Sequence, residues 1–208
     1  MLIRPVYDDG SHSEDKDNQY DKYAVDLGLT SLWSSVNLDN SEFFSWGESL
    51  PKASFTLDTY EHYDKDSNSF TDIGNVISNT KYDAVQAMWG GKWHMPTYYD
   101  FQELNEQCTW EKASVNGVNG YKVTGPSGNS IFLPFTGYYT ATSTSPAYSD
   151  SKSRYLSGTL YTLPAIESIP HSYVYAYAID ADTDPQESQP NKFYRYWGAV
   201  IRPVRSKS

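Results

Sequence analysis

The fold is decided by residues 90–97, GGKWHMPT, because they end one predicted helix and begin another. The two glycines stop the segment 81–89, since glycine readily adopts the left-handed conformation at a helix C-terminus. Pro96 then precedes a predicted helix over Thr97–Gln107, in which Thr97 and Asp100 have the spacing of a capping box. These two segments are the helices that we expect.

Short β-like runs precede the two helices. Aromatic and β-branched residues, separated by Gly, Asn, Asp and Ser, predict strands at 23–27, 31–38 and 43–46. Residues 50–80 are polar and have no sustained period, so we interpret them as a long excursion from the domain.

Predicted antiparallel strands dominate the C-terminal half. Residues 121–125 and 130–134 flank the turn residues Pro-Ser-Gly-Asn and predict a hairpin, while Asn116-Gly117 and Asn119-Gly120 predict further turns. Other strands are predicted at 172–180, 193–197 and 199–204. A few helices with many antiparallel strands are typical of the α+β class and not of a βαβ fold.

The composition excludes several classes of protein. With 16 Lys and Arg against 26 Asp and Glu, the formal net charge is −10, which repels phosphate backbones and argues against nucleic acid as a partner. No apolar run approaches the roughly 18 residues of a membrane helix, so no membrane insertion is predicted. Aromatic residues make up 16% of the chain, which is too many for a wholly disordered protein.

An acidic segment over residues 8–22 divides the chain. Such a segment stays solvated and extended. Before it, the sequence Ile3-Arg4-Pro5-Val6 is repeated near the C-terminus as Ile201-Arg202-Pro203-Val204. We therefore expect residues 1–22 to be a linker or the tail of a preceding repeat, and residues 23–208 to be one domain. The N-terminus lacks the apolar core of a signal peptide, so we expect any export signal to lie outside this chain.

The usual catalytic and metal-binding groups are scattered. Cys108 is the single cysteine and falls on the apolar side of a helix end, which predicts a structural thiol and no intramolecular disulfide. The four histidines lack metal-ligand spacing; they are His12, His62, His94 and His171. No cofactor and no catalytic residue is predicted.

Calcium is the alternative for two acidic loops. Residues 64–72 place oxygen donors at alternate positions, but Ser69 and Asn75 stand where an EF-hand needs Gly and Glu, so a solvated loop is the default. In the loop over residues 180–191, carboxylates repel one another unless they are solvated or bridged by a hard cation. The calcium candidates there are Asp180, Asp182, Asp184 and Glu187.

Recognition chemistry is the main signal of the last third. Alternation over residues 172–180 directs Val174, Ala176 and Ala178 to one face and Tyr173, Tyr175, Tyr177 and Ile179 to the other. Tyrosine with Ser, Asn and Asp is typical of antibody binding loops. Aromatic faces also stack on sugar rings. The alternative is that these tyrosines only cover a two-sided sheet. The predicted ligand-binding residues are Tyr173, Tyr175, Tyr177, Asp180, Asp182, Asn191, Tyr194, Tyr196 and Trp197.

Several ordered motifs read together from about residue 23 to residue 205. They are YAVDLGL with Leu32-Trp33, FFSWGE at 43–48, WGGKWHMPT at 89–97, NGVNGYKVTG at 116–125, NSIFLP at 129–134 and RYWGAVIRPV at 195–204. This order resembles the Fibrobacter succinogenes major paralogous domain family, which is common in exported proteins of gut Bacteroidetes. His94 departs from the Arg that the family usually has, and residues 156–159, LSGT, stand where a Tyr-Trp-Ser-Ser stretch is usual.

The resemblance implies a C-type-lectin-like fold, allied to formylglycine-generating enzymes and to the variable proteins of diversity-generating retroelements. The enzyme branch uses a pair of cysteines, so a chain with one is not expected to be an enzyme. Calcium-dependent lectins combine Gln-Pro-Asn with Trp-Asn-Asp, and only the first is present, at residues 189–191. Residues 173–197 occupy the position of the diversified segment in retroelement variable proteins and have its composition.

We therefore expect a non-catalytic extracellular or cell-surface recognition domain that binds a protein or glycan through its aromatic and polar C-terminal surface. The alternative is a structural or anchoring module of a multidomain cell-envelope or pilus-tip protein. A glycan hydrolase, the third reading, needs two facing carboxylates in a cleft. Scaffold roles are expected for Gly90, Gly91, Trp93, Pro96, Arg202 and Pro203.

Overall fold

The computed structural model describes residues 18–161, 174–181 and 190–207. Within these ranges the chain has two α-helices and many short antiparallel strands, which confirms the mixed α+β class. The helices are α1 (Ala84–Met88) and α2 (Tyr98–Gln107). Short 3-10 helices lie at η1 (Asp21–Tyr23), η2 (Leu38–Ser41) and η3 (Leu57–Thr59).

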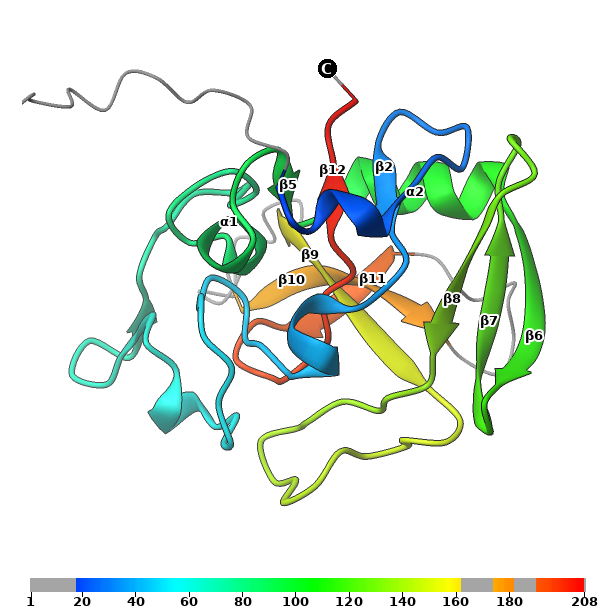
Figure 1. The fold of residues 1–208 in the computed structure, drawn as a ribbon. Coiled ribbons are helices and arrows are strands. Elements are labelled where there is room, and N and C mark those ends of the chain that lie inside the picture. The colour runs from blue at the N-terminus through cyan, green and yellow to red at the C-terminus, as the bar shows by residue number, and fades with distance from the viewer. Residues whose placement is uncertain (1–17, 162–173, 182–189, 208) are drawn as a thin grey trace, which may run out of the picture.

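The described strands form small sheets around a central one. The central sheet has the order β11 (Pro190–Tyr194), β10 (Tyr175–Ala181), β9 (Ser153–Leu160). A second sheet has the order β6 (Thr109–Val115), β7 (Val118–Thr124), β8 (Ser130–Pro134). A third has the order β1 (Ala24–Val25), β2 (Leu32–Ser34), β12 (Val204–Arg205), β5 (Trp93–His94), and β3 (Tyr63–Asp64) pairs with β4 (Ser69–Phe70). Figure 1 shows α2 across the top of the molecule, with β6–β8 at one end and α1 toward the other.

Both predicted helices are confirmed, and each begins where a side chain caps it. Thr97 is the N-cap of α2 and forms the expected capping box with Asp100. The first helix is shorter than the predicted 81–89, because the Asp83 carboxylate accepts the N–H groups of Val85 and Gln86 and so fixes the start at residue 84. The glycines after it adopt positive φ angles of 64° and 61°, as a helix stop requires.

The predicted hairpin is confirmed as β7 and β8, but one predicted turn is wrong. Asn116-Gly117 turns between β6 and β7 with φ angles of 52° and 82°. Asn119-Gly120, in contrast, lies inside β7 and pairs with both neighbouring strands. A Cβ on Gly120 would lie 2.3 Å from the Leu133 carbonyl oxygen, so this glycine permits close approach between strands and does not make a turn.

The predicted strand over 43–46 is wrong as well. In this segment Phe44 forms a single bridge with Ala199, and the Trp46 N–H donates to the Arg195 carbonyl. Phe44 and Trp46 are both buried. The aromatic run therefore reflects burial against the segment 195–199 and not a strand ladder.

The central sheet separates two hydrophobic cores because neighbouring residues on its strands point to opposite sides. The first core contains Tyr155 of β9 and Ile179 of β10, and the second contains Leu156 and Ala178, the residues next to them. Helix α2 adds Phe101 to the first core. The predicted alternation of residues 172–180 is thus confirmed where the structure describes it, although β10 begins at Tyr175.

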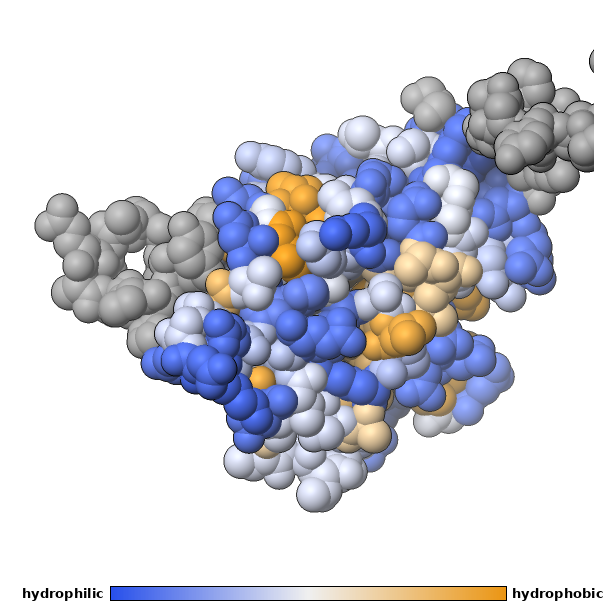
Figure 2. Space-filling model, turned by 90° about the vertical axis from the view of Figure 1, so that its left-hand side faces the viewer, coloured by the Kyte–Doolittle hydropathy of each residue, from blue (hydrophilic) through white to orange (hydrophobic). Residues whose placement is uncertain are grey.

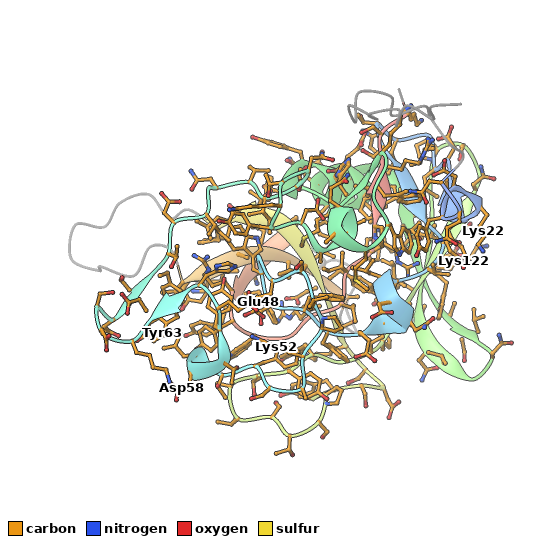
Figure 3. All side chains as sticks on the ribbon, turned by 60° about the vertical axis from the view of Figure 1, so that its left-hand side comes forward. Lys22, Glu48, Lys52, Asp58, Tyr63 and Lys122 are labelled. Carbon is orange, nitrogen blue, oxygen red and sulfur yellow. The ribbon has the colours of Figure 1, made fainter. Side chains whose placement is uncertain are left out.

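The excursion over residues 50–80 is attached by a buried charge. Glu48 is 4% exposed, and its carboxylate pairs with Lys52 at 2.6 Å and accepts the Glu61 N–H. Figure 3 shows Glu48 and Lys52 side by side. The Tyr60 hydroxyl donates to the Trp46 carbonyl at 2.6 Å.

On the face toward the viewer in Figure 2, which is the left-hand side of Figure 1, apolar residues form separate patches among hydrophilic ones.

Several expected scaffold residues are buried, and one of them joins sheets. Arg202 is 1% exposed and donates to the Ser34 carbonyl of β2 and to the Phe132 carbonyl of β8. The Trp93 indole N–H donates to Asp21, at the end of the segment that the sequence assigns to the linker. Trp93, Pro96 and Pro203 are also buried.

Candidate functional site

The candidate site is built on the paired strands β10 and β11. Their register sets Tyr175 opposite Tyr194 and Tyr177 opposite Lys192. Cross-strand partners point to the same face of a sheet, so these four side chains share one face. The rings of Tyr175 and Tyr194 have centroids 4.6 Å apart, and the three tyrosines are half-buried. They are therefore surface residues with a packed base and not ordinary core.

A row of touching rings extends from this pair. We call it the tyrosine row, and its members are Tyr98, Tyr161, Tyr175, Tyr177, Tyr194, Tyr196 and Trp197. Neighbouring centroids are 4.5 to 6.4 Å apart. All seven residues are half-buried. Edge-to-face and tilted ring contacts at these distances are mutually favourable, which holds the row in place before any ligand arrives.

A bulge in β9 brings helix α2 to the row. Leu160 pairs with Ala176 and Leu156 with Ala178, so Ser157–Thr159 lie opposite one residue, Tyr177. The bulged segment bonds to the start of the helix, since the Gly158 N–H donates to the Pro96 carbonyl and the Tyr98 N–H donates to Thr159. The Tyr98 ring consequently lies 4.5 Å from Tyr177.

At its other end the row turns around the edge of β11. Trp197 contacts Tyr194 at 4.8 Å and Phe193 at 5.6 Å, although these neighbours in sequence point to opposite faces of the strand. Beyond Trp197 the ring of Tyr138 contacts both Phe193 and Tyr148, and Tyr148 is 55% exposed. The aromatic surface therefore continues onto the loop after β8.

Arg195 anchors the segment between the exposed rings. Its side chain is buried, with the guanidinium carbon 4.7 Å from the Trp46 ring and its Nε donating to the Tyr60 hydroxyl at 2.6 Å. Burial is the main cause that raises the pKa of Tyr60, so this hydroxyl stays protonated. Because Arg195 points inward, its neighbours Tyr194 and Tyr196 are presented at the surface.

Three hydroxyl groups of the row, those of Tyr175, Tyr177 and Tyr196, have a raised pKa. A hydrogen bond with Tyr194 is the largest cause that raises the pKa of Tyr175 to about 12. Desolvation raises the pKa of Tyr177 and of Tyr196, and neighbouring tyrosines add to both shifts. These three tyrosines therefore present ring faces and protonated hydroxyl groups, chemistry suited to stacking and hydrogen bonding.

Two predicted site residues of the described strands lie apart from the row. Asn191 pairs with Ala178, so the register places it on the face of Phe193 and away from the tyrosines. Asp180 points to that face too and forms an ion pair with Arg154. Tyr173 and Asp182, also predicted, lie outside the described residues. Sequence reasoning missed Tyr98, Tyr161 and Tyr138, whose contacts with the row depend on long-range packing.

The calcium candidates find little support in the residues that the structure describes. Asp180 is occupied by Arg154, and Asp182, Asp184 and Glu187 lie outside the described ranges. In the other loop the Asp64 carboxylate accepts from Asp66 and Ser67 in a tight turn between β3 and β4. Across the described ranges no group of three or more His, Cys, Asp or Glu is placed to hold a metal ion.

The scattered histidines and the thiol have structural contacts. His94 is buried, with Nδ1 2.9 Å from the Met95 carbonyl, and His62 has Nε2 2.9 Å from the Gly47 carbonyl. Burial and the Glu103 charge raise the pKa of the Cys108 thiol to about 11, which keeps it protonated and unreactive as a nucleophile. His12 and His171 lie outside the described residues.

Compared with protein-family models, with curated proteins and with solved structures, the chain matches none. The family resemblance drawn from the sequence motifs therefore stays a prediction. Among the described residues no helix is both long and apolar enough to span a membrane.

Proposed function

We propose that this chain is a non-catalytic recognition domain that binds a glycan or a protein through the tyrosine row. The observation that carries the proposal is the continuity of the row: seven half-buried rings from α2, the residue after β9, β10, β11 and the turn after β11 touch one another at the surface. Half-buried tyrosines offer large contact area at low conformational cost, because their packed bases leave few rotamers to lose on binding.

We also propose the fold and the location that the sequence resemblance implies. A C-type-lectin-like scaffold on an exported or cell-surface protein would hold the row toward outside partners. The inward-facing Arg195 and the bulge of β9 support the rigid presentation that such a role needs.

A double variant, Tyr175→Ala with Tyr194→Ala, tests the proposal. These residues form the centre of the row, and a central aromatic residue of an interface commonly contributes about 2 kcal/mol or more, so the loss of even one such contribution should weaken binding at least ~30-fold. The wild-type chain and the variant are compared on a glycan array and on an array of cell-surface proteins. Circular dichroism verifies that the variant is folded.

The matched control is Tyr63→Ala, which removes a half-buried tyrosine from the β3–β4 hairpin, where its ring packs 5.3 Å from Phe70. This control should bind like the wild type. Equal binding by the folded double variant would defeat the proposal, as would a wild-type chain that binds neither array.

A second function, an anchoring module of a repeated envelope protein, is favoured by the Ile-Arg-Pro-Val repeat. In the domain this sequence at residues 201–204 is buried and leads into β12, between β2 and β5. The same four residues recur in the sequence at 3–6, as the tail of a preceding copy would have them. Sequencing the gene upstream tests this function: a further copy of segment 23–204 supports it, and unrelated sequence contradicts it.

A further inference from the structure

A small hollow lies apart from the tyrosine row and shares no lining residue with it. Its volume is about 250 Å3, and it lies between the N-terminal turn with α1 on one side and the η2 segment on the other. The first wall contributes Tyr20, Tyr23 and Trp89, and the second contributes Asp39 and Asn40. The hollow thus combines aromatic rings with a carboxylate.

The aromatic wall is held rigidly. Tyr20 stacks on Trp89 with centroids 4.6 Å apart and planes 3° from parallel, and Tyr23 lies 5.8 Å from Trp89. Behind them Trp93 meets the Trp89 ring edge-on at 5.1 Å. The Asn18 amide donates to the Trp89 carbonyl at 2.7 Å, which fastens the N-terminal segment against the helix. These rings are preorganised and need little reordering on binding.

The opposite wall holds a carboxylate on an unusual backbone. Asp39, Asn40 and Ser41 have consecutive positive φ angles of 43°, 54° and 73°, which costs free energy for residues with a Cβ. Asp39 is half-buried, and among its contacts with the described parts of the chain its carboxylate has neither a hydrogen-bond donor nor an ion-pair partner. A partly desolvated carboxylate without a partner attracts a cation.

The ligand chemistry follows from these two walls together. A cation gains from the negative faces of the rings and from the carboxylate, while an anion is repelled by Asp39. The Tyr23 ring is already engaged by a cation of the chain, since Lys22 Nζ lies 5.0 Å from its centroid, so a ligand cation depends on the other rings of the wall and on Asp39. The lining also includes the apolar side chains of Met88 and Val36, which favour methyl groups over the hydrogen-bonding protons of a primary ammonium. We propose that this hollow binds a quaternary ammonium head group.

The experiment titrates the full chain with choline chloride and, separately, with 3,3-dimethylbutan-1-ol, which has the same shape without the charge. Binding is followed by calorimetry and by the NMR shift of the Trp89 indole N–H. Choline should bind at least ~10-fold more tightly than the alcohol, because the neutral molecule lacks both attractions. Equal affinity for the two, or no choline binding, overturns the proposal.

The variant Asp39→Asn tests the contribution of the Asp39 charge without changing the backbone conformation. Asparagine tolerates the left-handed conformation at least as well as aspartate, so the variant should fold and lose only the carboxylate. Its affinity for choline should fall about 2- to 5-fold, the change expected when one partly exposed ion pair is lost.

The matched control is Asp58→Asn, an exposed aspartate whose side chain pairs with Lys65. Figure 3 shows Asp58 far from Lys22, which neighbours the hollow. The control should bind choline like the wild type. Unchanged choline affinity in Asp39→Asn, or an equal loss in both variants, contradicts the assignment. Because this proposal is independent of the tyrosine row, its failure leaves the proposed recognition function untouched.

Discussion

The hydrogen bond between Tyr175 and Tyr194 sets the pKa of Tyr175 at the centre of the tyrosine row. Tyr175 and Tyr194 face each other across β10 and β11, and their hydrogen bond contributes more to the raised pKa of Tyr175 than burial does. The bond stabilises the protonated form. A folded-state pKa of about 12 lies above the ordinary value of 10.0, so this stabilisation is complete below pH 10 and is lost as the pH rises toward 12.

The variant Tyr194→Phe tests this origin of the shift. It keeps the ring and its packing but removes the hydroxyl partner, so the pKa of Tyr175 should fall from about 12 toward 10.0. Titration of the tyrosine Cζ resonances measures it, with the Tyr175 signal assigned through Tyr175→Phe. An unchanged pKa would show that desolvation alone holds the value up.

At the scale of elements, α1 is too short to be stable by itself. A helix of five residues makes few internal hydrogen bonds, and isolated helices below about 12 residues are marginal. Asp83 compensates: its buried carboxylate accepts N–H groups from Asn79, Val85, Gln86 and Met95. Through Met95 it also ties the helix to the segment after β5.

We expect Asp83→Ala to cost about 2–4 kcal/mol of unfolding free energy, because it removes an N-cap and leaves buried N–H groups without acceptors. Urea unfolding followed by circular dichroism measures the loss. The control Asp72→Ala removes a carboxylate that accepts one exposed N–H, from Gly74, and should cost less than about 1 kcal/mol. Similar losses in both variants would mean that the capping network is not what holds α1.

The sequence predicted those elements whose ends are fixed by nearby residues, such as a helix cap or a hairpin turn. The other elements depend on packing between distant parts of the chain. The second helix was predictable because Thr97 and Asp100 mark its start, and the β7–β8 hairpin because of its turn residues. Strand β6 was missed because its exposed and half-buried residues show no regular alternation. For the site, Tyr175 and Tyr177 were predictable from alternation, and Tyr194 from the tyrosine-rich composition of the last third. Tyr98 was not, because it reaches the row only through the β9 bulge.

At the scale of the whole molecule, both cores depend on the same strands. Tyr155 and Leu156 are neighbours on β9 but belong to different cores, and so do Ala178 and Ile179 on β10. Arg202 adds a polar connection, since it bonds to β2 and β8 from a fully buried position beside Tyr155. Because the same strands contribute side chains to a core on each face of the sheet, one core cannot be lost without exposing the back of the other.

The two cores should therefore unfold in a single cooperative transition. Trp33 reports on the first core and Trp93 on the second, and both are fully buried. With 5-fluorotryptophan in place of tryptophan, the 19F signals of these two residues should disappear at the same urea concentration, as expected for one cooperative unit. Assignment uses Trp33→Phe and Trp93→Phe, each in the labelled chain. Midpoints that differ by more than about 0.5 M, which corresponds to roughly 1 kcal/mol at the usual slope, would show that the cores are separate units and that the central sheet does not couple them.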